Sequence, residues 1–322
     1  MICRCRGDGV EEYVAMTTQL ITHPACLNHD TGRGHPERAA RLETILNTLD
    51  APEFHSLVRI KAPEASREQI ALAHDSRYVA ALLEAVPKSG RVHADADTII
   101  SSGSGDAALR AAGAAIAAVD AVMSGEARNA FCAVRPPGHH AEAARPMGFC
   151  LFNNVAIGAY HARARYGVGR VAVIDFDVHH GNGTQHIFES DAGMFYGSTH
   201  QWPLYPGTGA RTERGVGNIC NAPLPTGAGS EAFRGAFSGI VLPALADFAP
   251  ELLLISAGFD AHRRDPLAGL ELETEDFAWA TAELMAVADR CCGGRVVSTL
   301  EGGYDLDALA ASAAAHVRCL MN

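Results

Sequence analysis

Short apolar runs alternate with longer stretches of helical character along most of this chain, and that alternation limits the folds open to it. Strands are predicted at 129–134, 170–176 and 194–199, and at the starts of 251–260 and 295–304. Helices are predicted at 104–124, with Ser104 as a candidate N-cap, at 153–167, at 231–248 with a kink at Pro243, at 274–290 and at 306–320. A helical turn is predicted at 186–190. This order is typical of a mainly parallel sheet with helices on both faces. We therefore predict a single α/β domain over residues 16–322.

Five polar motifs directly follow predicted strands. They are "RPPGHH", "DVHHGNG", "STH", "GFDAH" and "EGGY". In an open parallel sheet, ligands bind outside the carboxyl ends of the strands. We therefore expect these segments to meet at one rim of the sheet, although they lie far apart in the sequence.

Asp177 and His179 follow the apolar run at Val171–Ile174. Residues two apart in extended backbone point to the same side, so this carboxylate and imidazole can share one cation. Asp260, at the end of another strand, can supply a third ligand and leave a position open, as catalytic zinc sites require. The alternative is that all three are polar residues capping the sheet edge; their combination with a nearby histidine pair favours the metal site.

The adjacent histidines His139 and His140 follow the stiff turn "RPPG" and are candidates for proton transfer beside the metal. Asp175, one pleat before Asp177, is predicted to orient His139, and Asn182 to orient His140. Such partners fix the tautomer and basicity of a working imidazole. The alternative for the histidine pair is a packing role.

Tyr304 follows two glycines, Gly302 and Gly303, which let the chain approach a ligand closely. Its phenol can donate a hydrogen bond to a carbonyl oxygen that becomes an oxyanion. The alternative is a tyrosine that only packs at the rim. Phe149 and Tyr205 come from loops at the same rim and can form a slot around a slim alkyl chain.

These motifs together closely resemble the histone deacetylase superfamily, which has the arginase/deacetylase fold with an eight-stranded, mainly parallel sheet. The resemblance covers about residues 22–310 and rests on "HPERAARL", "RPPGHHAE", "GFCLFNN", "IDFDVHHGNGTQHIF", "YPGTG", "SAGFDAH" and "EGGYDL". Two of these segments resemble the class II branch and its bacterial single-domain relatives, which include acetylpolyamine amidohydrolases.

The resemblance implies one catalytic Zn²⁺ on the Asp/His/Asp set, the histidine pair as general acid and base, and Tyr304 polarising the acyl carbonyl. It also implies a substrate tunnel, whose residues are Asp97, Gly148, Phe149, Tyr205, Leu267 and Gly302. Asp95 is a rival of Asp97 because this loop varies in length. Leu267 lies where a polyamine-preferring relative carries glutamate, and Arg41 is assigned to an inner cavity through which acetate leaves.

One or two structural K⁺ ions are also implied by the resemblance. The first site would use Asp175, Asp177, His179, Ser198 and Thr199. The second would use the main chain of Phe188, Asp191 and Met194.

Composition limits the classes of binding partner and the cellular compartment that we expect for this chain. The formal net charge of −11 leaves no basic footprint for a nucleic-acid backbone. The nine cysteines are scattered, which fits a reducing cytoplasm, and no uncharged apolar run reaches the length of a membrane span. Patterned sequence begins after Met16, so residues 1–15 are expected to be an extension that is disordered or precedes the natural start. The segment 24–38 is a candidate lid or a candidate contact with a second copy of the chain.

The function implied by the resemblance is zinc-dependent hydrolysis of acyl amides. The substrate would be an acylated lysine side chain of a protein or peptide, or a small N-acylated amine. Three alternatives stay open: a non-catalytic protein that binds acyl ligands, an amidohydrolase selective for acetylpolyamines, and a ureohydrolase. A ureohydrolase of the arginase type would need more aspartates, for two manganese ions.

Overall fold

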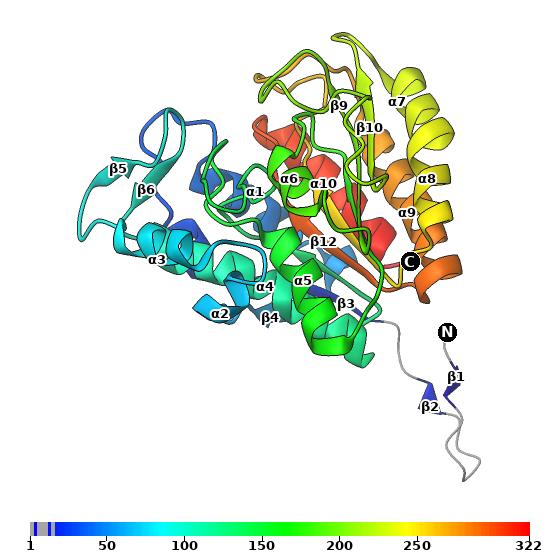
Figure 1. Ribbon diagram of the computed structural model, residues 1–322, viewed down its shortest axis with the longest axis horizontal. Helices are drawn as coiled ribbons and strands as arrows, with labels where there is room; N and C mark the ends of the chain where they lie inside the picture. The colour runs from blue at the N-terminus through cyan, green and yellow to red at the C-terminus, as the bar shows by residue number, and fades with distance from the viewer. Residues whose placement is uncertain (1–2, 5–11, 14–16) are drawn as a thin grey trace.

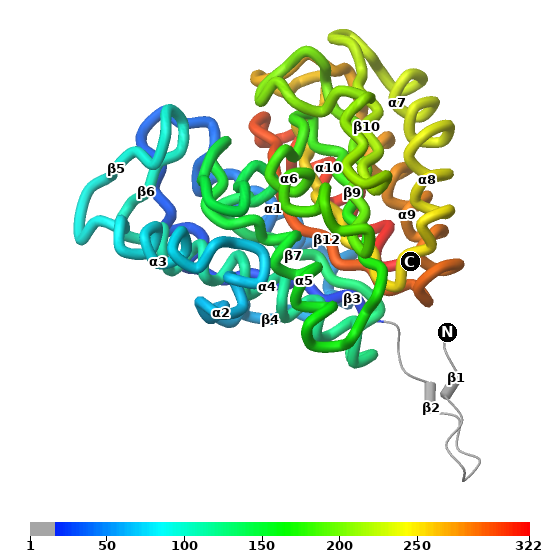
Figure 2. Tube along the Cα trace, in the orientation of Figure 1, coloured from blue at the N-terminus to red at the C-terminus, as the bar shows by residue number. Residues whose placement is uncertain are grey.

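A computed structural model describes residues 3–4, 12–13 and 17–322 (Figures 1 and 2). Its centre is a sheet of eight parallel strands, in the spatial order β10-β9-β8-β11-β12-β7-β3-β4. The strands are β3 (Thr18–Thr22), β4 (Val58–Lys61), β7 (Asn129–Cys132), β8 (Val171–Asp175), β9 (Met194–Gln201), β10 (Ile219–Leu224), β11 (Leu252–Ala257) and β12 (Val296–Leu300). The predicted parallel α/β fold is therefore confirmed.

Helices cover both faces of the sheet (Figure 1). They are α1 (Ala39–Thr48), α2 (Arg67–Ile70), α3 (Ser76–Glu84), α4 (Ser104–Ser124), α5 (Asn154–Tyr166), α6 (Asn182–Phe188), α7 (Ser230–Ala236), α8 (Leu242–Phe248), α9 (Thr274–Cys292) and α10 (Leu306–Leu320). On one face α4 packs on α5, and on the other α10 packs between α1 and α9. Two short antiparallel pairs, β1 (Cys3–Arg4) with β2 (Glu12–Tyr13) and β5 (Arg91–His93) with β6 (Ile99–Ser101), lie outside the main sheet. Apart from β1 and β2, the predicted extension at 1–15 and Met16 lie outside the described residues.

The central strands β8, β11 and β12 are buried along their whole length, which explains why each begins with a run of apolar residues. The sequence analysis did not identify the strands at the sheet edges. β10 contains Asn221 and Pro223, and a proline is tolerated there because an edge strand has one side without a partner. β4 is the opposite edge and is mostly exposed, so it lacks the apolar signal of a buried strand.

Local signals place most helix ends correctly, with three differences. α5 begins after Asn153, whose side chain accepts a hydrogen bond from the Ala156 amide, and ends at Gly167 in the left-handed conformation. The predicted kink at Pro243 is instead a π-helical turn, Phe237–Val241, between α7 and α8. Ser104 is the first residue of α4 and not its cap.

The third difference concerns α6, which begins at Asn182, earlier than the predicted turn at 186–190. Asn182 therefore has a position fixed by the first turn of a helix. This matters for the site described below.

The Ala-rich helix α4 is a core element of the fold. By length and composition it could cross a membrane, but 67% of its most apolar window is buried inside the protein. Small residues let it pack closely: a Cβ atom added at Gly113 would lie 2.0 Å from the Pro63 carbonyl oxygen.

His316 is a buried polar residue between the layers. Its Nδ1 lies 2.7 Å from Thr281 Oγ1, and its Nε2 lies 2.8 Å from Ser298 Oγ. Because Thr281 donates its own hydroxyl hydrogen to the Phe277 carbonyl, Nδ1 must carry the imidazole proton and Nε2 must accept from Ser298. Burial lowers the pKa of His316 to about 3, so the ring is neutral in the folded protein.

We predict that His316 makes the protein less stable in acid. Its pKa is about 6.5 when unfolded and about 3 when folded, so the stabilisation is complete above pH 6.5 and is lost as the pH falls. The expected loss is about 1.4 kcal/mol of unfolding free energy for each pH unit. Urea unfolding at several pH values should show a slope that is shallower by one proton in His316→Gln. Ser298→Ala should lower stability but keep the wild-type slope; an unchanged slope in His316→Gln would contradict this assignment.

Candidate metal centre and active site

Three predicted ligands meet at the carboxyl ends of the neighbouring strands β8 and β11. Asp177, His179 and Asp260 are buried, and one donor atom from each lies within 4.8 Å of the others. His179 Nδ1 is 3.1 Å from Asp177 Oδ1 and 3.2 Å from Asp260 Oδ2. The structure thus brings together side chains that are distant in sequence, since Asp260 lies 83 positions after Asp177.

This cluster has the chemistry of a cation site. The second oxygen of each carboxylate is held by a main-chain amide: Asp177 Oδ2 accepts from Gly302, and Asp260 Oδ1 accepts from Val178, each at 2.8 Å. The remaining oxygens face the His179 nitrogen, an arrangement that requires positive charge between them. Burial alone would lower the pKa of His179, but these two carboxylates raise it to about 10. A proton or a metal ion must therefore sit there.

Two glycines keep the space around the carboxylates open. A Cβ atom at Gly302 would lie 1.9 Å from Asp260 Oδ2, and one at Gly258 would lie 2.0 Å from Asp177 Oδ2. Any larger residue would occupy the place of an ion or of its ligands. The donor set, its burial and this open space fit a divalent ion with an exposed coordination position.

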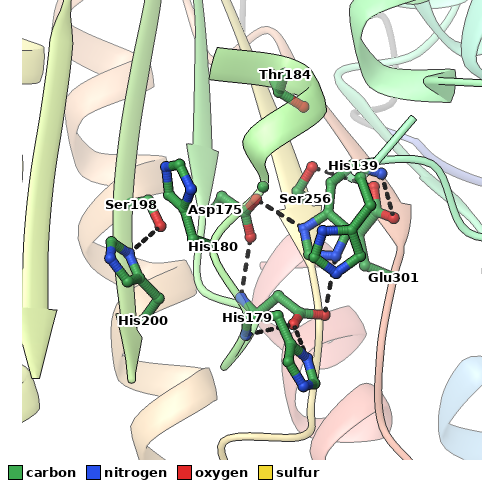
Figure 3. Close-up of polar contacts among 12 residues, drawn as sticks. His139, Asp175, His179, His180, Thr184, Ser198, His200, Ser256 and Glu301 are labelled. Atoms are coloured by element: carbon green, nitrogen blue, oxygen red, sulfur yellow. Dashed lines mark hydrogen bonds and ion pairs between the residues drawn. The ribbon is translucent and has the colours of Figure 1, made fainter. Parts of the chain in front are cut away.

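His139 is held by Asp175, as Figure 3 shows. Its Nδ1 donates to Asp175 Oδ2 at 3.0 Å, and the same oxygen accepts from the Tyr196 hydroxyl at 3.0 Å. Burial alone would lower the pKa of His139, but the carboxylates of Asp177, Asp175 and Glu301 outweigh burial and hold the pKa well above its usual value. These carboxylates therefore favour the protonated form of the His139 imidazole.

His140 has the opposite protonation state. Its Nδ1 lies 2.8 Å from Asn182 Oδ1, and the Asn182 amide nitrogen donates to Glu142 Oε1 at 2.9 Å. That second bond fixes the orientation of the amide, so His140 Nδ1 must be the donor. Burial, followed by the charges of His139 and His179, lowers the pKa of His140 well below its usual value. The ring is neutral, with a lone pair on Nε2.

The loop that carries both histidines is anchored by Glu301, a residue that the sequence analysis missed (Figure 3). Glu301 Oε2 accepts from the main-chain amides of Gly138 at 2.7 Å and His139 at 3.1 Å, and Oε1 accepts from Ser256 Oγ at 3.1 Å. A carboxylate directly after a predicted buried strand, as in "TLEGGY", was the available signal. Glu301 fixes the main chain at the first histidine.

Tyr304 lies at the same rim. Its amide donates to Asp265 Oδ2 at 2.8 Å, and its ring lies 4.8 Å below the Arg41 guanidinium carbon and 6.1 Å from the Phe149 ring. Burial raises the pKa of the Tyr304 phenol well above its usual value, and nearby Asp260 raises it further, so the phenol keeps its proton. The hydroxyl remains a hydrogen-bond donor.

Arg41 closes the inner side of the site. Its guanidinium donates to the main-chain oxygens of Gly303 and Glu301, each at 2.5 Å, and to Glu37 Oε1 at 3.1 Å. Glu37 is also paired with Arg135, through Oε2 at 2.7 Å and a second short bond at Oε1. Two buried guanidinium groups thus share one carboxylate, and positive charge remains beside the site. Glu37 and Arg135 were missed although both lie inside quoted motifs.

Asp95 and Asp97, the two candidates for the rim carboxylate, have different hydrogen-bond partners. Asp95 Oδ1 accepts from the amides of Asp97 and Thr98, at 3.0 and 2.7 Å, so it stabilises its own loop. Asp97 accepts from the Thr98 hydroxyl, which in turn accepts from the Phe149 amide at 3.2 Å. Burial and then Asp95 raise the pKa of Asp97. Asp97, and not Asp95, is therefore linked to the rim phenylalanine.

Aromatic rings line the predicted tunnel. The Tyr205 ring lies 5.2 Å from the His140 ring, and the His35 ring, which the sequence analysis missed, lies 4.7 Å from the Phe149 ring. Gly148 has positive φ, and a Cβ atom there would lie 2.3 Å from His140 Cδ2, so a glycine is required beside that ring.

Leu267 is 37% exposed and lies two residues after Asp265, which contacts the Tyr304 amide. Its amide donates to Asp265 Oδ1 at 2.9 Å. Asp265 therefore joins the leucine loop to Tyr304, and burial followed by the charge of Asp260 raises its pKa to about 7.

Two of the residues predicted for the first potassium site, Asp175 and Ser198, lie side by side on neighbouring strands. Asp175 of β8 is in register with Ser198 of β9, so their side chains share a face of the sheet. Ser198 Oγ also lies 2.9 Å from His200 Nδ1. Thr199 points to the opposite face and could offer only its main-chain oxygen.

The second predicted monovalent site does not fit this chain. The main-chain oxygens of Phe188, Asp191 and Met194 converge as expected, but each accepts a hydrogen bond from the side-chain nitrogen of Asn218. The amide group stands where the ion was predicted, and this prediction is wrong because the sequence motif gave no sign of that long-range contact.

Comparison with known proteins agrees with this geometry. The profile of the histone deacetylase domain matches residues 35–320. The chain is 41% identical to the histone deacetylase-like amidohydrolase of Pseudomonas aeruginosa, over 84% of this chain and 73% of that protein. It is 38% identical to human polyamine deacetylase HDAC10, over 88% of this chain and 44% of that protein. The crystal structure of the HDA15 HD domain superposes with a TM-score of 0.89 at 35% identity, covering 95% of this chain and 88% of that one.

We predict that Asn182→Asp raises the pKa of His140 by about 1–3 pH units, because a carboxylate at 2.8 Å favours the imidazolium. Titration of the His140 ring nitrogens by NMR measures this shift directly. Glu142→Gln removes a charge from the same network without touching His140 and should shift its pKa far less. Shifts of equal size and opposite sign in the two variants would show that His140 responds to net charge and not to its partner at Nδ1.

Proposed function

The chain belongs to the histone deacetylase family, and from this premise we propose that it is a zinc-dependent hydrolase that removes acyl groups from amines. The observation that carries the proposal is the buried Asp177–His179–Asp260 cluster, whose three donor atoms can hold one metal ion, beside a histidine pair in which the pKa of His139 is raised and that of His140 is lowered. Hydrolysis of an unactivated amide needs a Lewis acid for the carbonyl, a base for the attacking water and an acid for the leaving amine. Membership of the family supports deacetylase chemistry in general.

Zinc suits the ligands, since it accepts carboxylate and imidazole donors and leaves a position open in catalytic sites. When bound, it would supply Lewis-acid polarisation of the acyl carbonyl and lower the pKa of a coordinated water. Asp177, His179 and Asp260 are the residues that would hold it. We also propose a structural K⁺ at the frame formed by Asp175 and Ser198.

The two histidines divide the proton transfers in this proposal. His140 is neutral, with its Nε2 lone pair available, so it accepts the proton of the attacking water. His139 carries a proton on Nε2 and delivers it to the nitrogen of the leaving amine. As the carbon–oxygen bond forms and the carbon–nitrogen bond breaks, the products are a carboxylate and a free amine. Asp175 and Asn182 keep each ring in the tautomer that its step requires.

Tyr304 stabilises the carbonyl oxygen in this scheme. Its phenol keeps its proton and can donate to that oxygen as negative charge develops. The Arg41 guanidinium over its ring adds positive charge on the same side. Arg41 also lies where a released carboxylate would meet a cation.

The rim supports acylated lysine of a peptide as the substrate. Phe149 and Tyr205 offer aromatic walls for an alkyl stem, and Asp97 offers a carboxylate for peptide amides at the mouth. Leu267 is apolar and offers no charge to select a cationic amine. Small acylated amines are the second candidate, because one relative is named a polyamine deacetylase.

The first test measures metal content and acetate release together. We expect about one zinc ion per chain, release of acetate from an acetyl-lysine peptide, loss of release with a chelator, and recovery on adding zinc. Acetylated polyamines, assayed in parallel, should have a lower kcat/KM. Zinc-loaded protein that hydrolyses neither class would leave only a binding function, and two manganese ions per chain would indicate a ureohydrolase.

The second test concerns Tyr304. We predict that Tyr304→Phe lowers kcat by about 10²–10³ with little change in zinc content, because one oxyanion donor is lost. Tyr160→Phe is the matched control, since the Tyr160 hydroxyl contacts the Ile187 carbonyl away from the site. A kcat for Tyr304→Phe within a few-fold of that control would remove the phenol from the mechanism.

A further inference from the structure

Three main-chain oxygens converge at the end of α6, outside the metal centre. They belong to Phe188, Asp191 and Met194, and they lie 2.8, 3.0 and 2.8 Å from the side-chain nitrogen of Asn218. The spacing of three residues comes from consecutive turns, in which Asp191 N donates to Phe188 O and Met194 N donates to Asp191 O, each at 2.9 Å. The carbonyls of this cluster all point at one atom.

The hydrogen-bond partners of the Asn218 carboxamide fix which way its oxygen and nitrogen point. Its side-chain oxygen accepts from the Val216 amide at 3.2 Å, and its main-chain oxygen accepts from the Tyr196 amide at 3.0 Å. A reversed carboxamide would place an oxygen against three carbonyl oxygens and would lose the Val216 bond. Only the NH₂ group, which carries partial positive charge, can face this cluster.

A cage of carbonyl oxygens at this distance is also what a dehydrated monovalent cation would seek. An ion and the Asn218 nitrogen cannot occupy the same point. Asn218 is buried, and it is held from behind by a close turn: a Cβ atom at Gly215 would lie 2.6 Å from both Asn218 Oδ1 and the Glu189 carbonyl oxygen. The turn at Gly215 therefore packs closely against the oxygen side of the carboxamide.

We infer that the Asn218 carboxamide replaces a monovalent cation at this carbonyl cluster, so that the chain binds no ion there. The helix held in this way begins at Asn182, which orients His140, and ends at Phe188. A covalently attached donor thus keeps that end of the helix in place at any K⁺ concentration. The inference concerns a place separate from the zinc ligands and does not depend on the proposed hydrolysis.

Two variants test whether the carbonyl cluster is occupied by the Asn218 amide or by an ion. Asn218→Ala removes the donor and leaves open space among the three oxygens, whereas Asn218→Leu removes the donor and fills the space. We expect both to lower Tm by roughly 2–8 °C in choline chloride, because the three carbonyl oxygens lose the Asn218 side-chain nitrogen as a hydrogen-bond donor. Replacing choline by K⁺ at equal ionic strength should restore most of that loss in Asn218→Ala and none in Asn218→Leu, beyond the response of the wild type.

The wild-type protein supplies an independent readout that does not require a variant to fold. Crystals soaked in Tl⁺ should show no anomalous peak among the oxygens of Phe188, Asp191 and Met194, whereas Asn218→Ala crystals should show one. A Tl⁺ peak at this point in the wild type, with the carboxamide displaced, would overturn the inference. So would an equal K⁺ response of the alanine and leucine variants.

Discussion

The compensation of buried negative charge is the constraint on which the rest of this structure depends. Four adjacent strands, β7, β12, β11 and β8, deliver their polar motifs to one edge of the sheet. The carboxylates gathered there, Asp175, Asp177, Asp260 and Glu301, are all fully buried. Buried carboxylates are tolerated only when cations or amide donors satisfy them. The loops beyond the strands are therefore shaped to present main-chain amides, and the histidines and an ion supply the remaining charge.

The same charges explain why two adjacent histidines of one loop differ so strongly. His139 faces carboxylates on more than one side and retains a proton, whereas His140 faces a neutral amide and two other imidazoles and loses one. Burial lowers the pKa of both rings, and the carboxylates of Asp177 and Asp175 outweigh burial only at His139. This asymmetry between Asp175 and Asn182 is the physical basis for proposing separate roles for the pair.

Much of the fold and of the centre could be predicted from local sequence. Buried strands began with apolar runs, and parallel topology then placed their following motifs at one edge. Residues whose importance comes from a distant partner could not be found this way. Glu37 is defined by Arg135, 98 positions away, and Asn218 by oxygens of the segment 188–194. A single sequence shows such residues as ordinary polar side chains, and the edge strand β10 is hard to identify because Asn221 and Pro223 interrupt its apolar residues.

The two carboxylates of the metal centre also act as braces between loops. Asp177 holds the amide of Gly302 beyond β12, which lies two strands from β8, and Asp260 holds the amide of Val178 beyond β8, the neighbour of β11. Shortening either side chain would thus loosen a link between two loops and also remove a metal ligand. Inactivity of a ligand variant would then combine altered architecture with altered chemistry, and only its unfolding behaviour could tell the two apart.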